Sequence, residues 1–401
     1  MIKISTNGNS VLWCSFLGGR ANEAGYVLAL GANNNLYVAG GTNSIDFPEI
    51  SSAGVIKSTR PSNSSDPCDG FVVELTNNGS AVITGTYLGT SLADQFYGIQ
   101  TDNEGNVYVM GTTNGSWPVV NASIFGATNS KQFVSKLKPD LSNYIYSTTF
   151  GSGSALPNIS PTAFLVDRCE NVYVSGWGGK SNQIESYGTG TTKNMPIVGP
   201  GVIKATTDAS GSDFYFIVIK KDATAQLYGT YFGQDDPPIG ANPETFGDHV
   251  DGGTSRFDRN GVIYQAICAN CNKTVNFPGT PGSWSTTNNA SGGGQCNLGM
   301  LKIRMNFAGV EAGPQASING VANDTAGCVP LKVDFTDTIQ NAKSYTWDFG
   351  DGSPRVTTTT TNVSHIYNAV GTYLVKQIAI ESTTCNIADT SFLRFAVGDN
   401  I

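Results

Sequence analysis

Short apolar runs with turn residues between them recur four times along the first three hundred residues of the chain. One run follows an Asn- or Gly-containing turn and joins Tyr to aliphatic neighbours. Its copies occupy residues 34–40, 105–111, 170–176 and 260–266. Asn and Gly tolerate the positive φ of tight hairpin turns, and Tyr beside β-branched residues suits a half-buried strand. Each copy is therefore predicted to be the second arm of a hairpin.

Three further elements follow each other in the same order. An apolar residue precedes proline at residues 47–48, 117–118, 195–196 and 277–278. Because proline cannot donate a hydrogen bond to a β-ladder, these positions are expected to be crossings between strands. A third run occupies residues 69–75, 131–137, 213–219 and 297–303. Its first two copies alternate, which predicts one buried face, whereas residues 214–219 are apolar throughout and predict burial on both faces. A phrase ending in Gly closes the first three units, at residues 86–89, 148–151 and 230–233.

The same closing phrase also stands alone at residues 14–18, before the first full unit. The last unit ends after its third strand, at residues 300–304. Repetition in a fixed order is typical of an array or a propeller. We therefore predict an all-β, four-bladed β-propeller over residues 1–307, closed by pairing residues 11–17 with residues 300–304. The alternative is an open array whose neighbouring blades lie outside this chain.

Beyond residue 307 the repeat stops, and the pattern predicts a second domain. Residues 308–313 are expected to be a linker. About seven short strands then follow over residues 314–401, which suits an immunoglobulin-like sandwich with Trp347 as its core anchor.

Two family resemblances rest on these residues. The segment 345–353 (YTWDFGDGS), followed by residues 365–367 (HIY) and 371–373 (GTY), resembles the PKD domain, an Ig-like module of extracellular proteins. The upstream units, with Asn-x-Tyr-Val-x-Gly, Asp-Phe-Pro and Thr-Tyr-Leu-Gly phrases, resemble SBBP bacterial β-propeller repeats over roughly residues 10–306. The pairing looks like large secreted cell-surface proteins of gliding bacteria that use type IX secretion.

Composition and charge narrow the classes of partner. Only 13% of the residues are charged and the net charge is −8. Without a basic footprint, neither nucleic acid nor an anionic membrane surface is an expected partner. No apolar stretch approaches the eighteen residues of a membrane span, and residues 1–5 lack the apolar core of a signal peptide. We interpret the chain as a segment of a longer secreted precursor, with a cytoplasmic protein as the alternative.

The eight cysteines fit an extracellular setting. In the second domain, Cys328 and Cys385 flank strands of one small sandwich and are predicted to form a disulfide. In the propeller, Cys268, Cys271 and Cys296 have the spacing of a zinc half-site. Tetrahedral zinc needs a fourth ligand, for which His249, Cys169 or Cys14 would be the candidates. A disulfide between Cys296 and one of the pair is favoured over zinc.

Candidate chemistry is sparse, because the chain has two histidines. His365 is assigned to the His-x-Tyr segment of the second domain. His249 lies among other polar residues at the opening of the fourth unit, where propeller loops converge, so a ligand site is conceivable. Its candidate residues are Asp248, His249, Asp251, Arg256 and Asp258. The competing interpretation, which we favour, is a hydrogen-bonded turn that fixes the fourth unit.

No cofactor is expected. Acidic turns at residues 102–106 and 258–261 resemble calcium loops in composition, and structural Ca²⁺ is the alternative, but they lack the ligand spacing of an EF-hand. Trp117, Trp177 and Trp284 could stack on sugars, yet each lies near a repeat position and is interpreted as packing.

Two function classes remain. The first is a non-enzymatic extracellular structural or adhesive protein, whose partners are protein subunits, extracellular polysaccharide or a host surface, and which could form oligomers or filaments. The second is a glycan-binding or glycan-degrading enzyme, a lyase or hydrolase, that uses the propeller loop face. The scarcity of histidine and the lack of a recurrent carboxylate pair favour the first.

Overall fold

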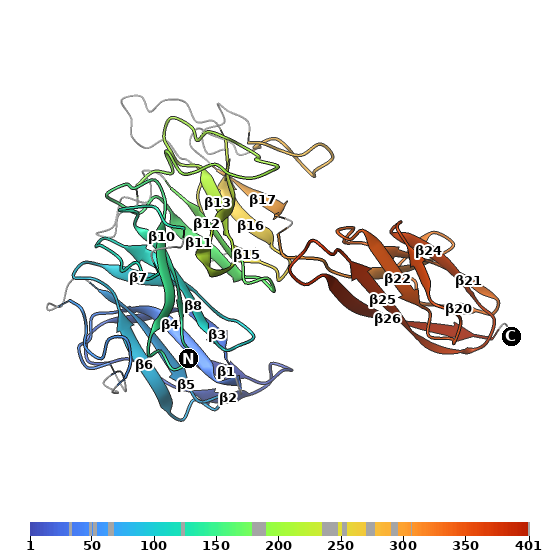
Figure 1. Ribbon diagram of the computed structural model, residues 1–401, viewed down its shortest axis with the longest axis horizontal. Helices are drawn as coiled ribbons and strands as arrows, with labels where there is room; N and C mark the ends of the chain where they lie inside the picture. Colours follow the sequence, from blue (N-terminus) through green and yellow to red (C-terminus); the bar gives the residue numbers. More distant parts are fainter. Residues whose placement is uncertain are drawn as a thin grey trace. The chain divides into compact units, whose positions relative to one another are not determined.

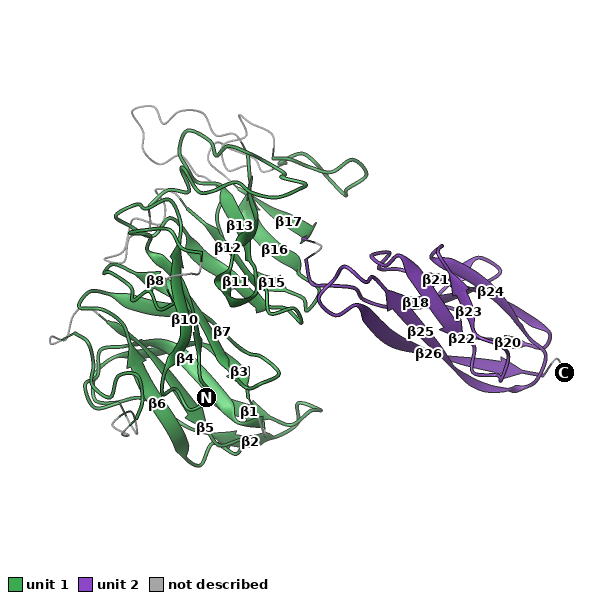
Figure 2. Cartoon of the chain, in the orientation of Figure 1, with its two compact units in different colours: residues 1–304 green, residues 305–401 purple. Residues whose placement is uncertain are grey.

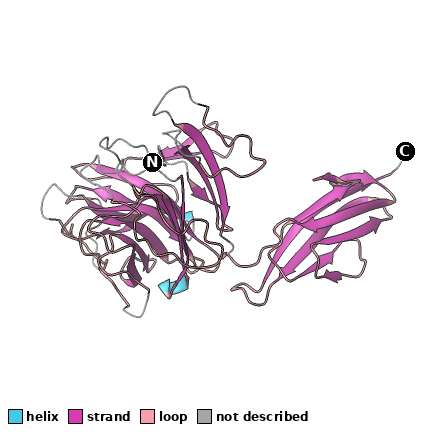
Figure 3. Cartoon of the chain, turned by 90° about the horizontal axis from the view of Figure 1, so that it is seen from above, coloured by secondary structure: helices cyan, strands magenta, loops and turns pink. Residues whose placement is uncertain are grey.

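The computed structural model describes the chain except residues 32–33, 48–49, 51–53, 63–67, 122–124, 179–189, 235–247, 251–254, 270–276, 290–295, 306 and 400–401. The chain divides into two compact units, Met1–Arg304 and Met305–Ile401 (Figure 2). Strands make up almost all of the regular structure (Figure 3). The fold is therefore all-β in both units, as predicted.

The first unit contains four successive antiparallel sheets whose strands follow chain order (Figure 1). The first sheet consists of β3 (Glu23–Leu30), β4 (Leu36–Thr42), β5 (Asp69–Leu75) and β6 (Val82–Leu88), and the second of β7 (Asp94–Thr101), β8 (Val107–Thr113), β9 (Gln132–Leu137) and β10 (Tyr144–Phe150). The third consists of β11 (Ser160–Val166), β12 (Val172–Trp177), β13 (Phe214–Ile219) and β14 (Gln226–Phe232), and the fourth of β15 (Arg256–Phe257), β16 (Val262–Ala269) and β17 (Asn297–Arg304).

The repeat extends to the register of the strands. Leu28 lies opposite Val38 in the first sheet, and Ile99 lies opposite Val109 in the second. The first strand of each of the first three sheets carries a register shift at the same place, two or three residues after its start. Residues of different sheets can therefore be compared position by position.

The third strands are buried on both faces. Every residue of β13 is at most 1% exposed, which confirms the prediction for residues 214–219. The alternation of the first two copies predicted one buried face, and this is wrong. β9 is buried along its whole length, Ser135 and Lys136 included. The polar positions of β9 are covered because a neighbouring sheet packs against each face.

The predicted closure of the ring is also wrong. β2 (Val11–Cys14) pairs with β1 (Ile2–Ile4) in a separate two-stranded sheet, and within the described strands β17 pairs only with β16. A hairpin partner a few residues away costs less loop entropy than a partner at the far end of the unit. The structure therefore shows four consecutive sheets of the repeat without the pairing that would close them.

The hairpin of β1 and β2 packs on the first sheet instead. Met1, Trp13 and Leu17 contact the buried cluster that includes Phe71. Trp13 lies against the turn between β5 and β6, where Gly79 has a φ of +67° and an added Cβ would come within 2.8 Å of the indole. The absence of a side chain at this turn lets the hairpin approach.

The second unit is a sandwich of two sheets. One has the order β19-β18-β21-β24 and the other β20-β26-β25-β22-β23. Their strands are β18 (Pro314–Ile318), β19 (Val321–Ala322), β20 (Ala326–Cys328), β21 (Leu331–Asp337), β22 (Ser344–Asp348), β23 (Val356–Thr358), β24 (Asn362–Tyr367), β25 (Gly371–Ile380) and β26 (Ala388–Gly398). Trp347 is fully buried in the core between them, as predicted. Val310 and Ala312 belong to the same core, so the segment expected to be a linker is packed into this unit.

Candidate functional site

The polar cluster predicted from the sequence lies at the start of the fourth sheet. Asp258 accepts hydrogen bonds from the backbone N–H groups of Asn260 and Val262, at 2.9 and 3.0 Å. This Asx-turn closes the hairpin between β15 and β16. Arg256 begins β15 and donates from Nη1 to the carbonyl of Ser255 at 2.6 Å. The turn thus gives Asp258 a structural role.

Asp248 and His249 lie in the segment that precedes this sheet, and each interacts with another part of the first unit. Asp248 is 2% exposed, and its Oδ2 accepts a hydrogen bond from the backbone N–H of Gln234 at 2.7 Å. His249 forms an isolated β-bridge with Cys268, and its ring centroid is 5.7 Å from that of Trp177. Asp251 lies outside the described residues. Ligand binding by this cluster stays a prediction.

The cysteine pairing predicted for the second unit is wrong. Cys328 is a free, exposed thiol, whereas Cys385 is disulfide-bonded. Cys328 lies opposite Gly398 at the end of β26, while Cys385 precedes the start of that strand. An 11-residue strand spans more than about 30 Å, and a disulfide needs Cα atoms within about 7 Å.

In the first unit, Cys169 and Cys296 each take part in a disulfide, and Cys271 lies outside the described residues. Within the described part of the chain, no group of three or more His, Cys, Asp or Glu side chains could hold a metal ion. His365, assigned to the second unit, lies with Nε2 2.7 Å from Asp351 and its ring stacked on Phe349.

The three tryptophans have different environments. Trp117 is buried and stacks on Phe133 with ring centroids 3.5 Å apart, and Trp177 is buried as well. These two are packing residues, as interpreted from their positions. Trp284 is 103% exposed, so the same interpretation is wrong for it. A loop position after proline does not by itself reveal whether a sheet covers the side chain.

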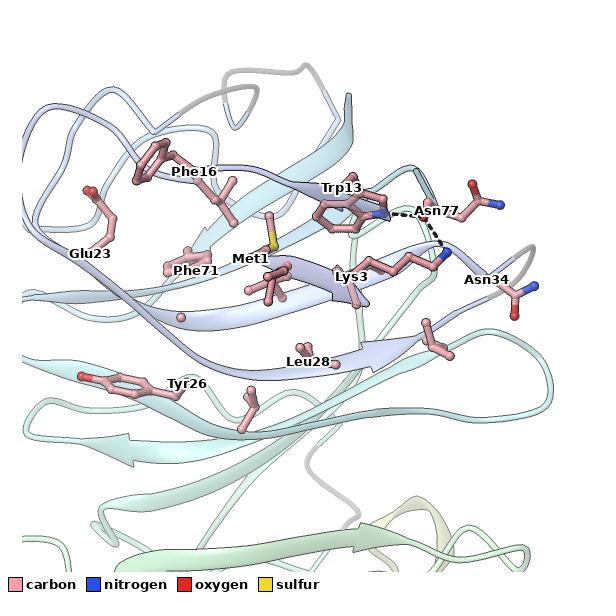
Figure 4. Close-up of a pocket in the computed structure, with 17 residues that line it drawn as sticks. Met1, Lys3, Trp13, Phe16, Glu23, Tyr26, Leu28, Asn34, Phe71 and Asn77 are labelled. Carbon is pink, nitrogen blue, oxygen red and sulfur yellow. Dashed lines mark hydrogen bonds between the residues drawn. The ribbon is translucent and has the colours of Figure 1, made fainter. Parts of the chain in front are cut away.

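A hollow lies on the first sheet, between β3 and the hairpin of β1 and β2 (Figure 4). It is a groove of about 860 Å³, here called the first-sheet groove. Its apolar side chains include Trp13, Phe16, Tyr26, Leu28, Leu30 and Phe71. Phe16 is 103% exposed, and Leu28 and Leu30 are 63% and 62% exposed. Figure 4 shows aromatic and aliphatic side chains along both walls.

Three polar side chains of the first-sheet groove, those of Lys3, Trp13 and Glu23, have partners within the protein. Lys3 Nζ and Trp13 Nε1 both donate to the carbonyl of Asn77, at 3.2 and 3.3 Å. Glu23 accepts hydrogen bonds from Thr42, at 3.0 Å, and from Ser44. The groove therefore offers mainly apolar surface.

A second exposed apolar surface lies at the other end of the first unit. Tyr264 lies opposite Lys302 in the fourth sheet, and Met300 and Leu298 follow on the same face of β17. Their exposed fractions are 44% for Tyr264, 80% for Met300 and 72% for Leu298. We call these four residues the fourth-sheet face.

Sequence reasoning missed both surfaces. Residues 26–30 (YVLAL) form an apolar run without polar alternation. Such a run predicts a strand that is covered on both faces. In the structure one face of this strand is left open. No local pattern distinguishes a covered strand from an uncovered one.

Comparison with protein families finds two matches. A PKD domain model matches residues 311–397, and a beta-propeller repeat model (SBBP) matches residues 85–116. The chain therefore carries a beta-propeller repeat and a PKD domain. The matched repeat spans the end of β6 in the first sheet and all of the hairpin of β7 and β8 in the second. No curated protein matches the chain.

Solved structures share only distant similarity. A Bacteroides caccae protein of unknown function is 12% identical, with a TM-score of 0.31 over 66% of this chain and 62% of that one. The extracellular domain of a B. thetaiotaomicron protein named as a one-component system is 10% identical, with a TM-score of 0.23 over 93% of this chain and 43% of that one. A polysaccharide lyase of family PL25, an ulvan lyase, is 11% identical, with a TM-score of 0.31 over 93% and 78%.

The chain thus spans 62% of the length of the Bacteroides caccae protein and 43% of the length of the B. thetaiotaomicron extracellular domain. Their identities and TM-scores are too low to transfer a function or a residue. In the described part of the chain, no helix is long and apolar enough to cross a membrane.

Proposed function

We propose that this chain is a non-enzymatic, extracellular structural module of a cell-surface protein, and that its repeat unit binds protein subunits through exposed apolar surface. The observation that supports this most is the first-sheet groove. Soluble proteins seldom expose large contiguous apolar patches unless the patch binds something. Phe16, Leu28 and Leu30 expose most of their side chains in one groove.

The chemistry of the groove favours a protein partner over a glycan. Sugar recognition needs polar groups that are free to bind hydroxyls as well as aromatic faces. Here Lys3 and Glu23 are hydrogen-bonded within the protein, and most of the other lining side chains are apolar. A PKD domain and disulfide-bonded cysteines support the extracellular location.

The test compares binding with turnover. Beads coated with the purified chain should be retained on surfaces coated with bacterial outer-surface protein, and the double variant Phe16→Ser, Leu28→Ser should lose this retention. Val119→Ser, which alters an apolar residue of similar exposure on another surface, is the matched control. Neutral and anionic polysaccharides incubated with the chain should release no reducing ends and no unsaturated uronic acids.

Release of such products by the wild type would replace the proposal with the enzyme alternative. Retention that is unchanged in the double variant would exclude the groove as the binding surface.

A further inference from the structure

Consecutive sheets of the first unit pack on each other, and each junction between them is formed by two complementary surfaces. At the first internal junction, Phe96 and Ile99 of β7 pack against Tyr37, Val72 and Leu88 of the first sheet. The second junction repeats this arrangement, with Phe164 of β11 packed in the cluster that holds Tyr108 and Val134. At each junction, a face formed around the second and third strands of one sheet thus packs against the first strand of the next sheet.

The fourth-sheet face is one half of such a junction. Tyr264 follows the turn residue Asp258 by six positions, as Tyr173 follows Asp167 and Tyr108 follows Asp102. Tyr108 and Tyr173 are fully buried, whereas Tyr264 is 44% exposed.

The neighbouring strand shows the same contrast. Met300 pairs with Ala266, as Val72 pairs with Ala39 and Val134 with Met110. Val72 and Val134 are 0% exposed, and Met300 is 80% exposed.

The first-sheet groove is the other half. Leu28 occupies the position of Ile99, since each lies opposite the valine that directly follows the tyrosine of its hairpin arm. Ile99 is 4% exposed and Leu28 is 63% exposed. The hairpin of β1 and β2 covers the part of this sheet near Phe71 and leaves β3 open.

We infer that the first-sheet groove of one copy binds the fourth-sheet face of a second copy, so that the chain assembles head to tail. This rests on the proposed function, for which it names the partner. The internal junctions show which surface each open half accepts, and one chain supplies both halves. Because the two surfaces differ, the contact is heterologous, and it continues from copy to copy as a filament or a large ring.

The experiment measures the mass of the complete chain by sedimentation velocity and light scattering across a wide range of concentrations. The background carries Cys14→Ser and Cys328→Ser, because both thiols are free and exposed and could cross-link copies. In this background the mass is expected to rise with concentration beyond that of a dimer.

Two single variants separate the surfaces. Leu28→Glu should block the groove and Met300→Glu should block the fourth-sheet face, and each variant alone should stay monomeric. An equimolar mixture should form a one-to-one complex and nothing larger, because only one intact groove and one intact face remain. Val119→Glu, an exposed apolar residue on neither surface, should assemble like the background.

Three results would overturn the inference. The first is a background protein that is monomeric at every concentration, and the second is a mixture of the two variants that stays monomeric. The third is a closed dimer that Leu28→Glu abolishes and Met300→Glu leaves intact, since this would show a symmetric groove-to-groove contact. A monomeric protein that still shows groove-dependent retention on outer-surface protein would overturn the self-assembly and leave the proposed function standing.

Discussion

The second and fourth sheets of the repeat unit are built on the same pattern but differ in burial. In the second sheet, Tyr108 and Val134 are fully buried, because one sheet packs on each face. In the fourth sheet, Tyr264 and Met300 occupy the same positions and are exposed. The repeat pattern therefore determines where each strand forms and in which register it pairs. Whether a neighbouring sheet packs on the strand determines how much each side chain contributes to stability.

The largest expected difference concerns two tryptophans. Trp117 stacks on Phe133 and donates from Nε1 to the hydroxyls of Ser135 and Ser147, at 3.2 and 2.9 Å. Trp117→Ala should lower the free energy of unfolding of the repeat unit by about 3–5 kcal/mol, because it leaves a cavity and removes these bonds. Trp284→Ala, at an exposed position of the fourth repeat, should change it by less than about 0.5 kcal/mol. Denaturant titration of both variants measures this, and equal effects would refute the comparison.

Two lysines at equivalent positions sharpen the contrast. Lys136, opposite Tyr108, is 4% exposed, and its Nζ lies 3.0 Å from Asp102 and 2.8 Å from Glu170. Burial acts to raise the pKa of Glu170, but hydrogen bonds from Lys136, Lys221 and Tyr108 lower it to about 2.

Lys136→Met should therefore cost about 3 kcal/mol of unfolding free energy, since it leaves two carboxylates without their buried cation. Lys302 lies opposite Tyr264 in the fourth-sheet face, with its Nζ 5.4 Å from the centroid of that ring. Lys302→Met should leave the unfolding curve almost unchanged. A loss of similar size in both variants would contradict the assigned environments.

A pH-dependent effect separates two internal junctions. Asp94 begins the second sheet and is fully buried, with Oδ2 accepting from the N–H of Thr90 at 2.6 Å. Burial raises its pKa to about 7. The folded state then binds a proton more tightly than the unfolded state, so this group's contribution to stability falls as the pH rises from about 4 to about 7, by at most about 1.4 kcal/mol per pH unit.

Asn158 occupies the corresponding place before the third sheet and accepts from the N–H of Ser152 at 3.0 Å. Asp94→Asn should place an uncharged amide at the second sheet's junction, as Asn158 does at the third. It should therefore reduce the pH dependence of the unfolding free energy between pH 5 and 7. Asp46→Asn, at a partly exposed carboxylate, is the control. An unchanged slope in Asp94→Asn would show that Asp94 is ionised throughout this range.

The smallest effect on folding is expected at Met300. In dilute, monomeric protein, Met300→Ala should not shift the unfolding transition, because the side chain is 80% exposed. Val134→Ala, at the buried equivalent, should cost about 2 kcal/mol. A clear loss of monomer stability in Met300→Ala would show that the fourth-sheet face is covered within one chain.

Particular residues show how far sequence reasoning reached. The hairpin arms around Tyr37, Tyr108 and Tyr173 and the core position of Trp347 could be predicted, because periodicity and turn residues are local signals. The role of Asp258 in a turn is local as well, and the structure shows it.

The errors have a common cause. The predicted pairing of residues 11–17 with β17 failed because β2 pairs with the nearby β1. The predicted disulfide failed because Cys328 and Cys385 lie at opposite ends of β26. Both predictions required a choice among partners distant in sequence, for which the local pattern carries no information. Burial on both faces of β9 could not be predicted, because a charged residue such as Lys136 is typical of a solvent-facing position and only the structure places Asp102 and Glu170 beside it.

The sequence by itself determined the all-β class, the four repeats, their order and the second, PKD-type unit, because each depends on strand and turn propensities over a few residues. Only the tertiary structure decided that the N-terminal hairpin packs on the first sheet, that Trp284 and Met300 are exposed, and that a groove lies open beside β3. These outcomes depend on which surfaces meet across the unit. The hydrophobic effect drives burial without specifying the partner, so the packing of whole sheets determines which apolar residues remain available for binding.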